Sequence, residues 1–390
     1  MEEDLRVIDL FCGAGGFSLG FEQAGFNIVA AVDRNESALK TYSYNFEDKE
    51  DPEACNRTFP LDVRDFSVED LEEHTEYSAE DIDIVIGGPP CKGFSTAGRM
   101  NPDDPRNELV VEYAKTVCDL DPKVVVMENV TGILGMKDGK YIMDLQETLS
   151  AGADGYTVSE PVIITAADYG VPQLRERVVI TATKEGSIEL PSPTHYPEDS
   201  QEKIDTDHAM YSYVTVEDAI GDLSFLQYGQ DTSEYKLWAR TDYQKEMRLD
   251  SEEIHNHVAP NHGETVRERF KQFEPGDTID DISEDYQTKK HSMMRWDPDA
   301  PAPTVTTLPE DFIHYERTRI PTVREIARIQ SFPDTFEFKG PRTTGGQRRR
   351  NSVPQYTQVG NAVPPKFAEK IAWKVREYLE SSVTTPGQGI

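Results

Sequence analysis

The chain lacks the features that mark several large classes of protein. No run of about 18 apolar residues occurs among its 390 residues, so no membrane span is predicted. It has four cysteines without Cys-x-x-Cys spacing, which predicts neither a zinc site nor a disulfide framework. These are Cys12, Cys55, Cys91 and Cys118. The N-terminus is acidic and leads directly into an apolar segment, unlike a signal peptide. We therefore expect a cytoplasmic protein whose thiols stay reduced.

Positive charge is also scarce. Forty Lys and Arg residues face 72 Asp and Glu residues, which leaves a net charge of −32. The acids are spread along the chain, which suits either a protein that avoids nucleic acid or one from a halophilic prokaryote, and favours the second. At molar salt the Debye length falls to about 3 Å, so repulsion from phosphates is mostly screened. The charge therefore does not exclude a DNA substrate.

The first 33 residues have the pattern of a nucleotide-binding β-turn-α-β unit. Residues 7–11 predict a buried strand, residues 12–16 a glycine turn and residues 17–24 a helix that stops at Gly25. Residues 27–32 predict the next strand, which ends at Asp33. Gly13 precedes this acid by twenty residues, a spacing typical of sites where glycines admit a ligand and the acid binds ribose hydroxyls. The unit predicts a nucleotide-like cofactor.

Strands and helices continue to alternate as far as about residue 185. Further strands are expected at residues 82–86, 124–127, 162–165 and 178–183. We expect Asn107 to cap a helix with an apolar face made by Leu109, Val110, Tyr113 and Val117. This alternation predicts an α/β fold with a Rossmann-like, doubly wound, mostly parallel sheet. The polar segment at about 185–315, rich in Pro, Asp and Tyr, predicts a second, smaller, irregular β-rich domain.

Regular patterns return near the C-terminus. A capping box at residues 322–325 predicts a helix with Ile326 and Ile329 on one face, which ends at Pro333. Residues 339–350 form a clear cationic patch, and we predict that its arginines contact phosphates. These are Arg342, Arg348, Arg349 and Arg350. A last helix carries an apolar stripe expected to pack in the core, made by Phe367, Ile371, Val375 and Tyr378.

Reactive side chains stand where strands are expected to end. Pro89-Pro90-Cys91-Lys92 follows the apolar run 83–88 and places a thiol at a strand end, where open α/β sheets bind ligands. Glu128 follows another strand, alternation puts Arg175 and Arg177 on one face, and Asn361 lies in a tight loop before the last helix. Each alone could be an ordinary strand-end cysteine, a solvated acid, a surface charge or a helix cap.

Together, and in this order, the motifs resemble those of the DNA (cytosine-5)-methyltransferases. The segments that carry the resemblance are 9–17, 88–91, 128–130, 173–177, 319–333 and 358–365. They span nearly the whole chain. One position departs from the family pattern, because Lys92 stands where the family usually has Gln, which affects how the catalytic loop supports the vacated base position.

The resemblance implies a class I methyltransferase that moves a methyl group from S-adenosylmethionine to C5 of a cytosine flipped out of specific duplex DNA. Cys91 would add to C6 as a thiolate, and Glu128 would hydrogen-bond the base and protonate N3. Arg177 would hold the base O2, and Arg175 would orient the site. Residues 92–106 would form the loop that closes over the base.

The resemblance also assigns a cofactor pocket. Its residues are Phe11, Gly13 and Gly15 at the amino-acid end, Asp33 at the ribose, Asp62 at the adenine amine, and Pro89, Leu109, Asn361 and Val363 as further lining. Residues 1–188, completed by 354–382, would form the catalytic domain. Residues 189–353 would form the target-recognition domain with the late scaffold helix, and residues 383–390 a flexible tail. No metal is expected.

We expect a monomer associated with the nucleoid, because base-flipping enzymes can act alone, and a cognate restriction endonuclease is a candidate partner. A tRNA cytosine-5 methyltransferase on the same scaffold is an alternative, although its late Cys-Phe-Thr tripeptide is missing here. A silent DNA-binding regulator is another, but it would be expected to lose Cys91, Glu128 or the arginines. A nucleotide-linked dehydrogenase would leave the Pro-Pro-Cys and Glu-Asn-Val elements unexplained.

Overall fold

The structure is a computed structural model that describes residues 4–47, 57–90, 108–152, 155–198, 211–288, 290, 292–343 and 352–383. The chain divides into two compact units. Unit 1 comprises Met1–Thr165, Glu176–Ser192 and Pro365–Ile390, and unit 2 comprises Ala166–Arg175 and Pro193–Pro364. Among the described residues, no helix is long and apolar enough to span a membrane.

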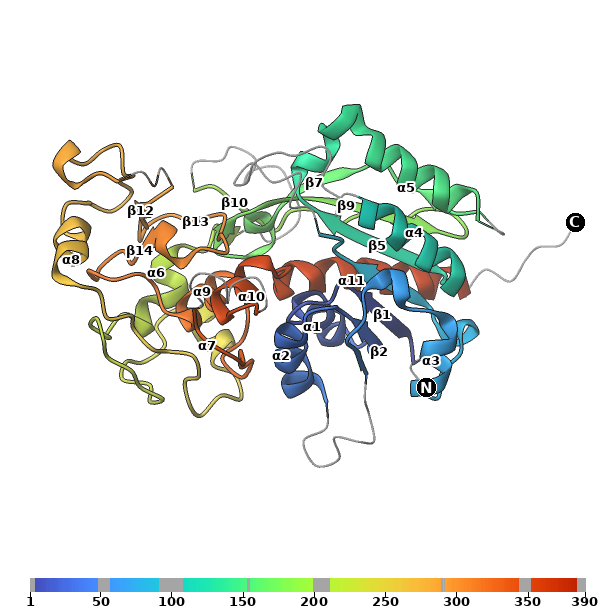
Figure 1. Ribbon diagram of the computed structural model, residues 1–390, viewed down its shortest axis with the longest axis horizontal. Coiled ribbons are helices and arrows are strands. Elements are labelled where there is room, and N and C mark those ends of the chain that lie inside the picture. Colours follow the sequence, from blue (N-terminus) through green and yellow to red (C-terminus); the bar gives the residue numbers. More distant parts are fainter. Residues whose placement is uncertain are drawn as a thin grey trace, which may run out of the picture. The chain divides into compact units, whose positions relative to one another are not determined.

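An eight-stranded sheet forms the centre of unit 1 (Figure 1). Its order is β3 (Thr58–Phe59), β2 (Asn27–Val32), β1 (Arg6–Leu10), β4 (Ile84–Gly87), β5 (Val124–Asn129), β9 (Glu176–Thr183) and β6 (Thr157–Val158), and β7 (Val162–Thr165) also pairs with β9. The strands from β3 to β5 are parallel, whereas β9 is antiparallel to its three neighbours. The predicted mostly parallel sheet is therefore confirmed.

The strand order reverses between β1 and β4. These strands pair side by side with Leu10 opposite Gly87, so the segments that follow them leave the sheet together. In open α/β sheets, the crevice at such a switch point is the usual ligand site. The glycine turn after β1 and the Gly-Pro-Pro turn after β4 therefore emerge at the same place.

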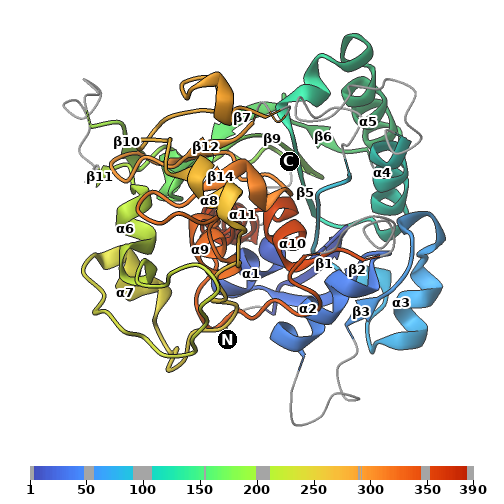
Figure 2. The same ribbon diagram turned by 60° about the vertical axis from the view of Figure 1, so that its left-hand side comes forward.

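Helices cover both faces of this sheet. Figures 1 and 2 show α4 (Leu109–Leu120) and α5 (Lys140–Ser150) together on one face, and α1 (Gly16–Gln23), α2 (Glu36–Phe46) and α11 (Pro365–Val383) on the other. The short helix α3 (Val68–His74) begins with a capping box. The four residues predicted to form the apolar face of α4 are buried. Asn107, the predicted cap of this helix, lies outside the described residues.

The C-terminal helix α11 packs against α1, which is more than 340 residues away in sequence. Gly20 permits this contact, because a Cβ there would lie 2.5 Å from the Pro365 carbonyl oxygen and 2.5 Å from the Ala368 Cβ. The predicted apolar stripe is buried at Phe367, Ile371 and Val375. Its last member differs: Tyr378 is half-buried, because its hydroxyl reaches the carbonyl oxygen of Glu185.

Unit 2 consists of short elements. Its helices include α6 (Val216–Ile220), α7 (Asp242–Met247), α8 (Glu264–Phe270), α9 (Val323–Ile329) and α10 (Gln355–Asn361). Its strands are two residues long: β8 (Gln173–Leu174), β10 (His195–Tyr196), β11 (Tyr211–Ser212), β12 (Met294–Arg295), β13 (Ala302–Pro303) and β14 (Phe312–Ile313). The strands pair two by two, as β10 with β11, β12 with β14 and β13 with β8.

Helix α9 lies at the centre of unit 2. The predicted capping box is present, with the Thr322 hydroxyl accepting from the Glu325 amide. Ile326 and Ile329 are buried, and so are the other five residues of the helix. Its charged residues are compensated inside the fold: Arg319 forms two 2.7 Å bonds to Glu325, and Arg328 pairs with Asp222 and Asp334. Such pairs make burial of charge tolerable.

Candidate active site

The turn after β1 is built from left-handed backbone conformations. Phe11, Gly13 and Gly15 have φ values of 65°, 56° and 96°. The sequence had suggested that the strand includes Phe11, but the strand ends at Leu10 and Phe11 begins the turn. A Cβ on Gly15 would lie 2.4 Å from Phe46 and 2.9 Å from Tyr42, so only glycine fits there. A Cβ on Gly13 would meet nothing within 4 Å, which leaves open space above the turn.

Asp33 ties this turn to the end of β2. Its carboxylate accepts one hydrogen bond from the Gly13 amide at 3.0 Å and one from the Asn35 amide at 2.7 Å. Burial raises the pKa of Asp33, while these two hydrogen bonds oppose that rise. The twenty-residue spacing therefore has a structural basis. Because a carboxylate has about four acceptor positions, two remain for the hydroxyls of a ribose.

A buried network beneath the turn was not anticipated from the sequence. Ser18 donates to Asp9 at 2.6 Å, and Tyr42 donates to Ser18 at 2.9 Å. Burial raises the pKa of Asp9 to about 7. Burial together with Asp9 and Asp33 also raises the pKa of the Cys12 thiol well above its usual value. Cys12 therefore stays protonated and is no candidate nucleophile.

Asp62 lies at the start of a short 3-10 helix, Val63–Asp65. Arg64 binds both of its carboxylate oxygens at 2.8 Å, and Arg34 lies 3.5 Å away. The hydrogen bond from Arg64 lowers the pKa of Asp62 to about 2. Asp62 is thus a permanently charged acceptor that already has partners. Leu109, the first residue of α4, is buried.

At the end of β5, Glu128 and Arg177 form an ion pair. Arg177 Nε lies 2.8 Å from Glu128 Oε1, and their side chains are 11% and 10% exposed. A Cβ on Gly88 would lie 3.4 Å from Glu128 Oε2, so this carboxylate borders the Gly-Pro-Pro turn after β4. The last described residue of that turn is Pro90, and both Cys91 and Lys92 lie outside the described residues.

The antiparallel direction of β9 produces this pair. Glu128 is opposite Val179, and Asn129 is opposite Val178. Arg177 lies two residues before Val179, on the same face of the sheet, and is therefore the diagonal neighbour of Glu128. The sequence placed each residue at a strand end, but the strand direction that joins them was not predicted.

Asn129 is a site residue that the sequence analysis did not assign. It is 1% exposed, and its amide donates to the Pro89 carbonyl oxygen at 3.1 Å. Its side-chain oxygen accepts from the Val130 amide at 2.9 Å. Asn129 thereby joins the end of β5 to the turn that leads to Cys91. Its place directly after Glu128 was the only signal in the sequence.

Arg175 lies in unit 2, where its side chain binds backbone carbonyl oxygens. It is 3% exposed, and its guanidinium donates to the carbonyl oxygens of Val305, Gly360 and Ala362 at 3.3, 3.2 and 3.2 Å. The last two belong to the late loop that also holds two expected cofactor residues, the exposed Asn361 at the end of α10 and the buried Val363. Arg175 therefore holds this loop in shape.

Gln173 and Gln330 complete the same arrangement. Gln173 donates to Gln330 at 2.7 Å and accepts from the Val305 amide at 2.7 Å. Gln330 in turn donates to the Val359 carbonyl oxygen at 2.8 Å. Three segments that the sequence analysis treated as separate motifs are thus hydrogen-bonded to one another within unit 2.

Sequence comparisons find similar proteins over nearly the whole chain. The chain is 36% identical to the type II methyltransferase M.DdeI of Desulfomicrobium norvegicum, over 97% of this chain and 90% of that protein. It is also 36% identical to M1.HphI of Haemophilus parahaemolyticus, over 94% of this chain and 86% of that protein.

Solved structures share the fold. A prophage-encoded protein of E. coli, assigned as a DNA modification methyltransferase, superposes with a TM-score of 0.73 at 27% identity and covers 97% of this chain and 100% of its own. The Dnmt2 methyltransferase of S. pombe superposes at 0.53 with 15% identity over 97% of this chain and 99% of its own, which shows the fold alone. The fold is that of class I S-adenosylmethionine-dependent methyltransferases.

The model of the C-5 cytosine-specific DNA methylase family matches residues 5–377. Together with the identities above, this match shows that the chain belongs to that family and is a DNA cytosine-5 methyltransferase of the type II restriction–modification kind.

Proposed function

We propose that this enzyme transfers a methyl group from S-adenosylmethionine to C5 of a cytosine flipped out of a specific duplex sequence, through a covalent bond between Cys91 and C6. The observation that carries the proposal is the Glu128–Arg177 ion pair, which borders the turn leading to Cys91. An acid and a cation that are held together beside a thiol can bind both edges of one cytosine.

The first turn fits the expected cofactor. Open space above Gly13 admits a ligand, and Asp33 retains acceptor positions for ribose hydroxyls. Phe11, Gly15, Pro89 and Leu109 would line the same crevice. Asp62 would offer a carboxylate to the adenine amine in competition with Arg64. Bound S-adenosylmethionine supplies an electrophilic sulfonium methyl group.

The chain's own residues would activate the base. C5 of cytosine is a weak nucleophile until a thiolate adds to C6, which Cys91 would provide. Glu128, once it is protonated and released from Arg177, would donate its proton to N3 as the thiolate adds, and this transfer prevents negative charge from building up on the ring. Arg177 would move from Glu128 to the base O2 or bridge both groups. After C5 has taken the methyl group, loss of the C5 proton to water restores the C5–C6 double bond and expels Cys91 as a thiolate, and N3 returns its proton to Glu128.

Arg175 would act as a positioning residue, because its guanidinium binds three carbonyl oxygens. Asn361 and Val363, held by that loop, would close the cofactor pocket. Residues 92–106 would close over the flipped base, with Lys92 in place of the usual Gln. Residues 189–353 would read the target sequence, and residues 1–188 with 354–382 would carry catalysis.

We further propose a monomer that acts on nucleoid DNA of a halophilic prokaryote, with a cognate endonuclease as a candidate partner. The spread of acidic residues behind the net charge of −32 supports the salt adaptation. Methyl transfer that rises from dilute to molar KCl would support it, and activity lost in molar KCl would contradict it.

The test is transfer of labelled methyl groups from S-adenosylmethionine to duplex DNA, with tRNA in parallel. Cys91→Ala should abolish label in 5-methylcytosine, whereas Cys118→Ala should not, because the half-buried Cys118 has a raised pKa from burial and serves as the matched control. Label in tRNA alone would overturn the DNA assignment. Full activity of Cys91→Ala would overturn the covalent mechanism.

A further inference from the structure

One stretch of the sequence, most of it in unit 2, departs from the acidic character of the chain. Between Glu337 and Glu369 there is no acidic residue, although acids make up 72 of the 390 residues. The cations in this stretch are Lys339, Arg342, Arg348, Arg349, Arg350 and Lys366. Exposed acids elsewhere keep phosphates away, so a stretch without them is where an acidic protein can approach a polyanion.

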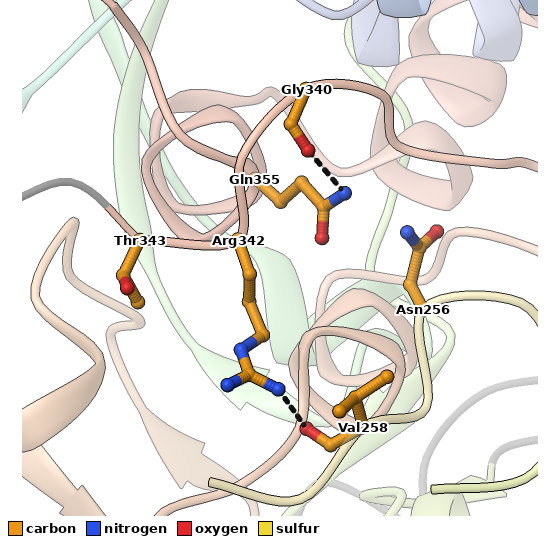
Figure 3. A pocket seen from close by; sticks show the side chains of 6 residues that line it. All are labelled: Asn256, Val258, Gly340, Arg342, Thr343 and Gln355. Atoms are coloured by element: carbon orange, nitrogen blue, oxygen red, sulfur yellow. Dashed lines mark hydrogen bonds between the residues drawn. The ribbon is translucent and has the colours of Figure 1, made fainter.

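A depression of about 430 Å³ lies on unit 2 beside this stretch (Figure 3). Its lining contains no carboxylate and consists of Asn256, Val258, Gly340, Arg342, Thr343 and Gln355. Gln355 donates to the carbonyl oxygens of Phe338 and Gly340 at 2.9 Å, and Asn256 donates to that of Phe338 at 2.8 Å. These amides frame the depression and hold its backbone in place.

Arg342 is the charged residue of this lining. Its Nη1 donates to the Val258 carbonyl oxygen at 3.1 Å, which fixes the direction of the guanidinium (Figure 3). Within the described part of the chain, no carboxylate lies within ion-pair distance of it. Other arginines behave differently: Arg64, Arg177 and Arg319 each pair with an acid. Because a guanidinium has five donors, Arg342 retains donors for an anion.

We propose that the depression around Arg342 binds a backbone phosphate of duplex DNA and thereby helps to orient the substrate. This inference rests on the proposed function, because the anion is assigned as DNA. Thr343, which is exposed, adds a hydroxyl donor at the same wall. A fixed arginine fork matches two phosphate oxygens, and the order imposed by Val258 lowers the entropic cost of binding. The site lies outside the catalytic residues and contributes affinity without sequence information.

The experiment measures binding of the full chain to fluorescein-labelled duplex DNA of random sequence across a KCl series. Arg342→Gln keeps a polar side chain with an amide donor but removes the charge. We expect the slope of log Kobs against log[KCl] to become shallower by about 0.9, and affinity in about 0.2 M KCl to fall about four-fold. Arg342→Lys should keep the wild-type slope. Lys271→Gln, which removes a half-exposed cation paired with Glu268 at 2.7 Å, is the control and should also keep it.

An unchanged slope in Arg342→Gln would overturn the proposal. An equally large decrease of the slope in Lys271→Gln or in Arg342→Lys would also overturn it. Melting curves of each variant verify folding. Methyl transfer by the wild-type protein separates the two proposals: if DNA is methylated and the Arg342→Gln slope is unchanged, only the phosphate site fails. If the wild-type protein neither binds nor methylates DNA, both fail.

Discussion

Replacing Asn129 by Ala should damage catalysis more than stability. The substitution removes two hydrogen bonds, to the Pro89 carbonyl oxygen at 3.1 Å and from the Val130 amide at 2.9 Å. Leaving a buried polar group without a partner costs about 1–3 kcal/mol, and Pro89 is buried. For a unit of this size about 1 kcal/mol shifts the melting temperature by roughly 2–4 °C. We expect a decrease of about 2–12 °C.

The catalytic effect follows from where the lost bond lies. Asn129 holds the backbone two residues before Cys91, so without it the thiol would no longer be fixed against the base. Misplacement of a reacting group by about 1 Å can cost about 100-fold in rate. We expect kcat to fall by about 10- to 100-fold, while KM for S-adenosylmethionine changes less than about two-fold.

Tyr156→Phe is the matched control. The Tyr156 hydroxyl donates to another buried proline carbonyl, that of Pro122, at 2.8 Å, but at the opposite end of β5. The Tyr156→Phe substitution should lower the melting temperature and leave kcat unchanged. Thermal unfolding and steady-state methyl transfer at saturating DNA measure both quantities. If Asn129→Ala keeps the wild-type kcat while both variants melt earlier, Asn129 supports only the fold and the reasoning is refuted.

Three further substitutions test the buried contacts. Because folding raises the pKa of Asp9 to about 7, the folded state binds its proton more tightly, and stability falls as pH rises from about 4 to 7. Asp9→Asn should therefore raise the melting temperature more at pH 8 than at pH 5; an equal shift at both would contradict this. Gly20→Ala should lower the free energy of unfolding in urea by about 1–3 kcal/mol, because the added methyl group forces α1 away from α11. Gly135→Ala should leave this free energy nearly unchanged, because there is open space around Gly135. Arg319→Met should cost about 3–5 kcal/mol by leaving Glu325 buried without its partner, and a loss below about 1 kcal/mol would count against that pair.

The local features of the fold could be read from the sequence. Residues 27–32 and 162–165 are strands with those bounds, and the Thr322–Glu325 capping box is present. The spacing of Gly13 and Asp33 corresponds to a real hydrogen bond. These features depend on periodicity and on contacts between neighbouring segments, which a sequence displays directly. The assigned roles of Cys91, Glu128 and the cofactor residues remain predictions.

The sequence alone determined which chemical groups the chain has, in what order, and at which strand ends they stand. Tertiary structure alone decided how they meet: the antiparallel β9 brings Arg177 to Glu128, and Asn129 reaches Pro89 across forty residues. It also turned Arg175 toward backbone carbonyls. The reason is physical, because strand direction and burial depend on the free energy of packing segments that are distant in the chain, and no local pattern records that energy.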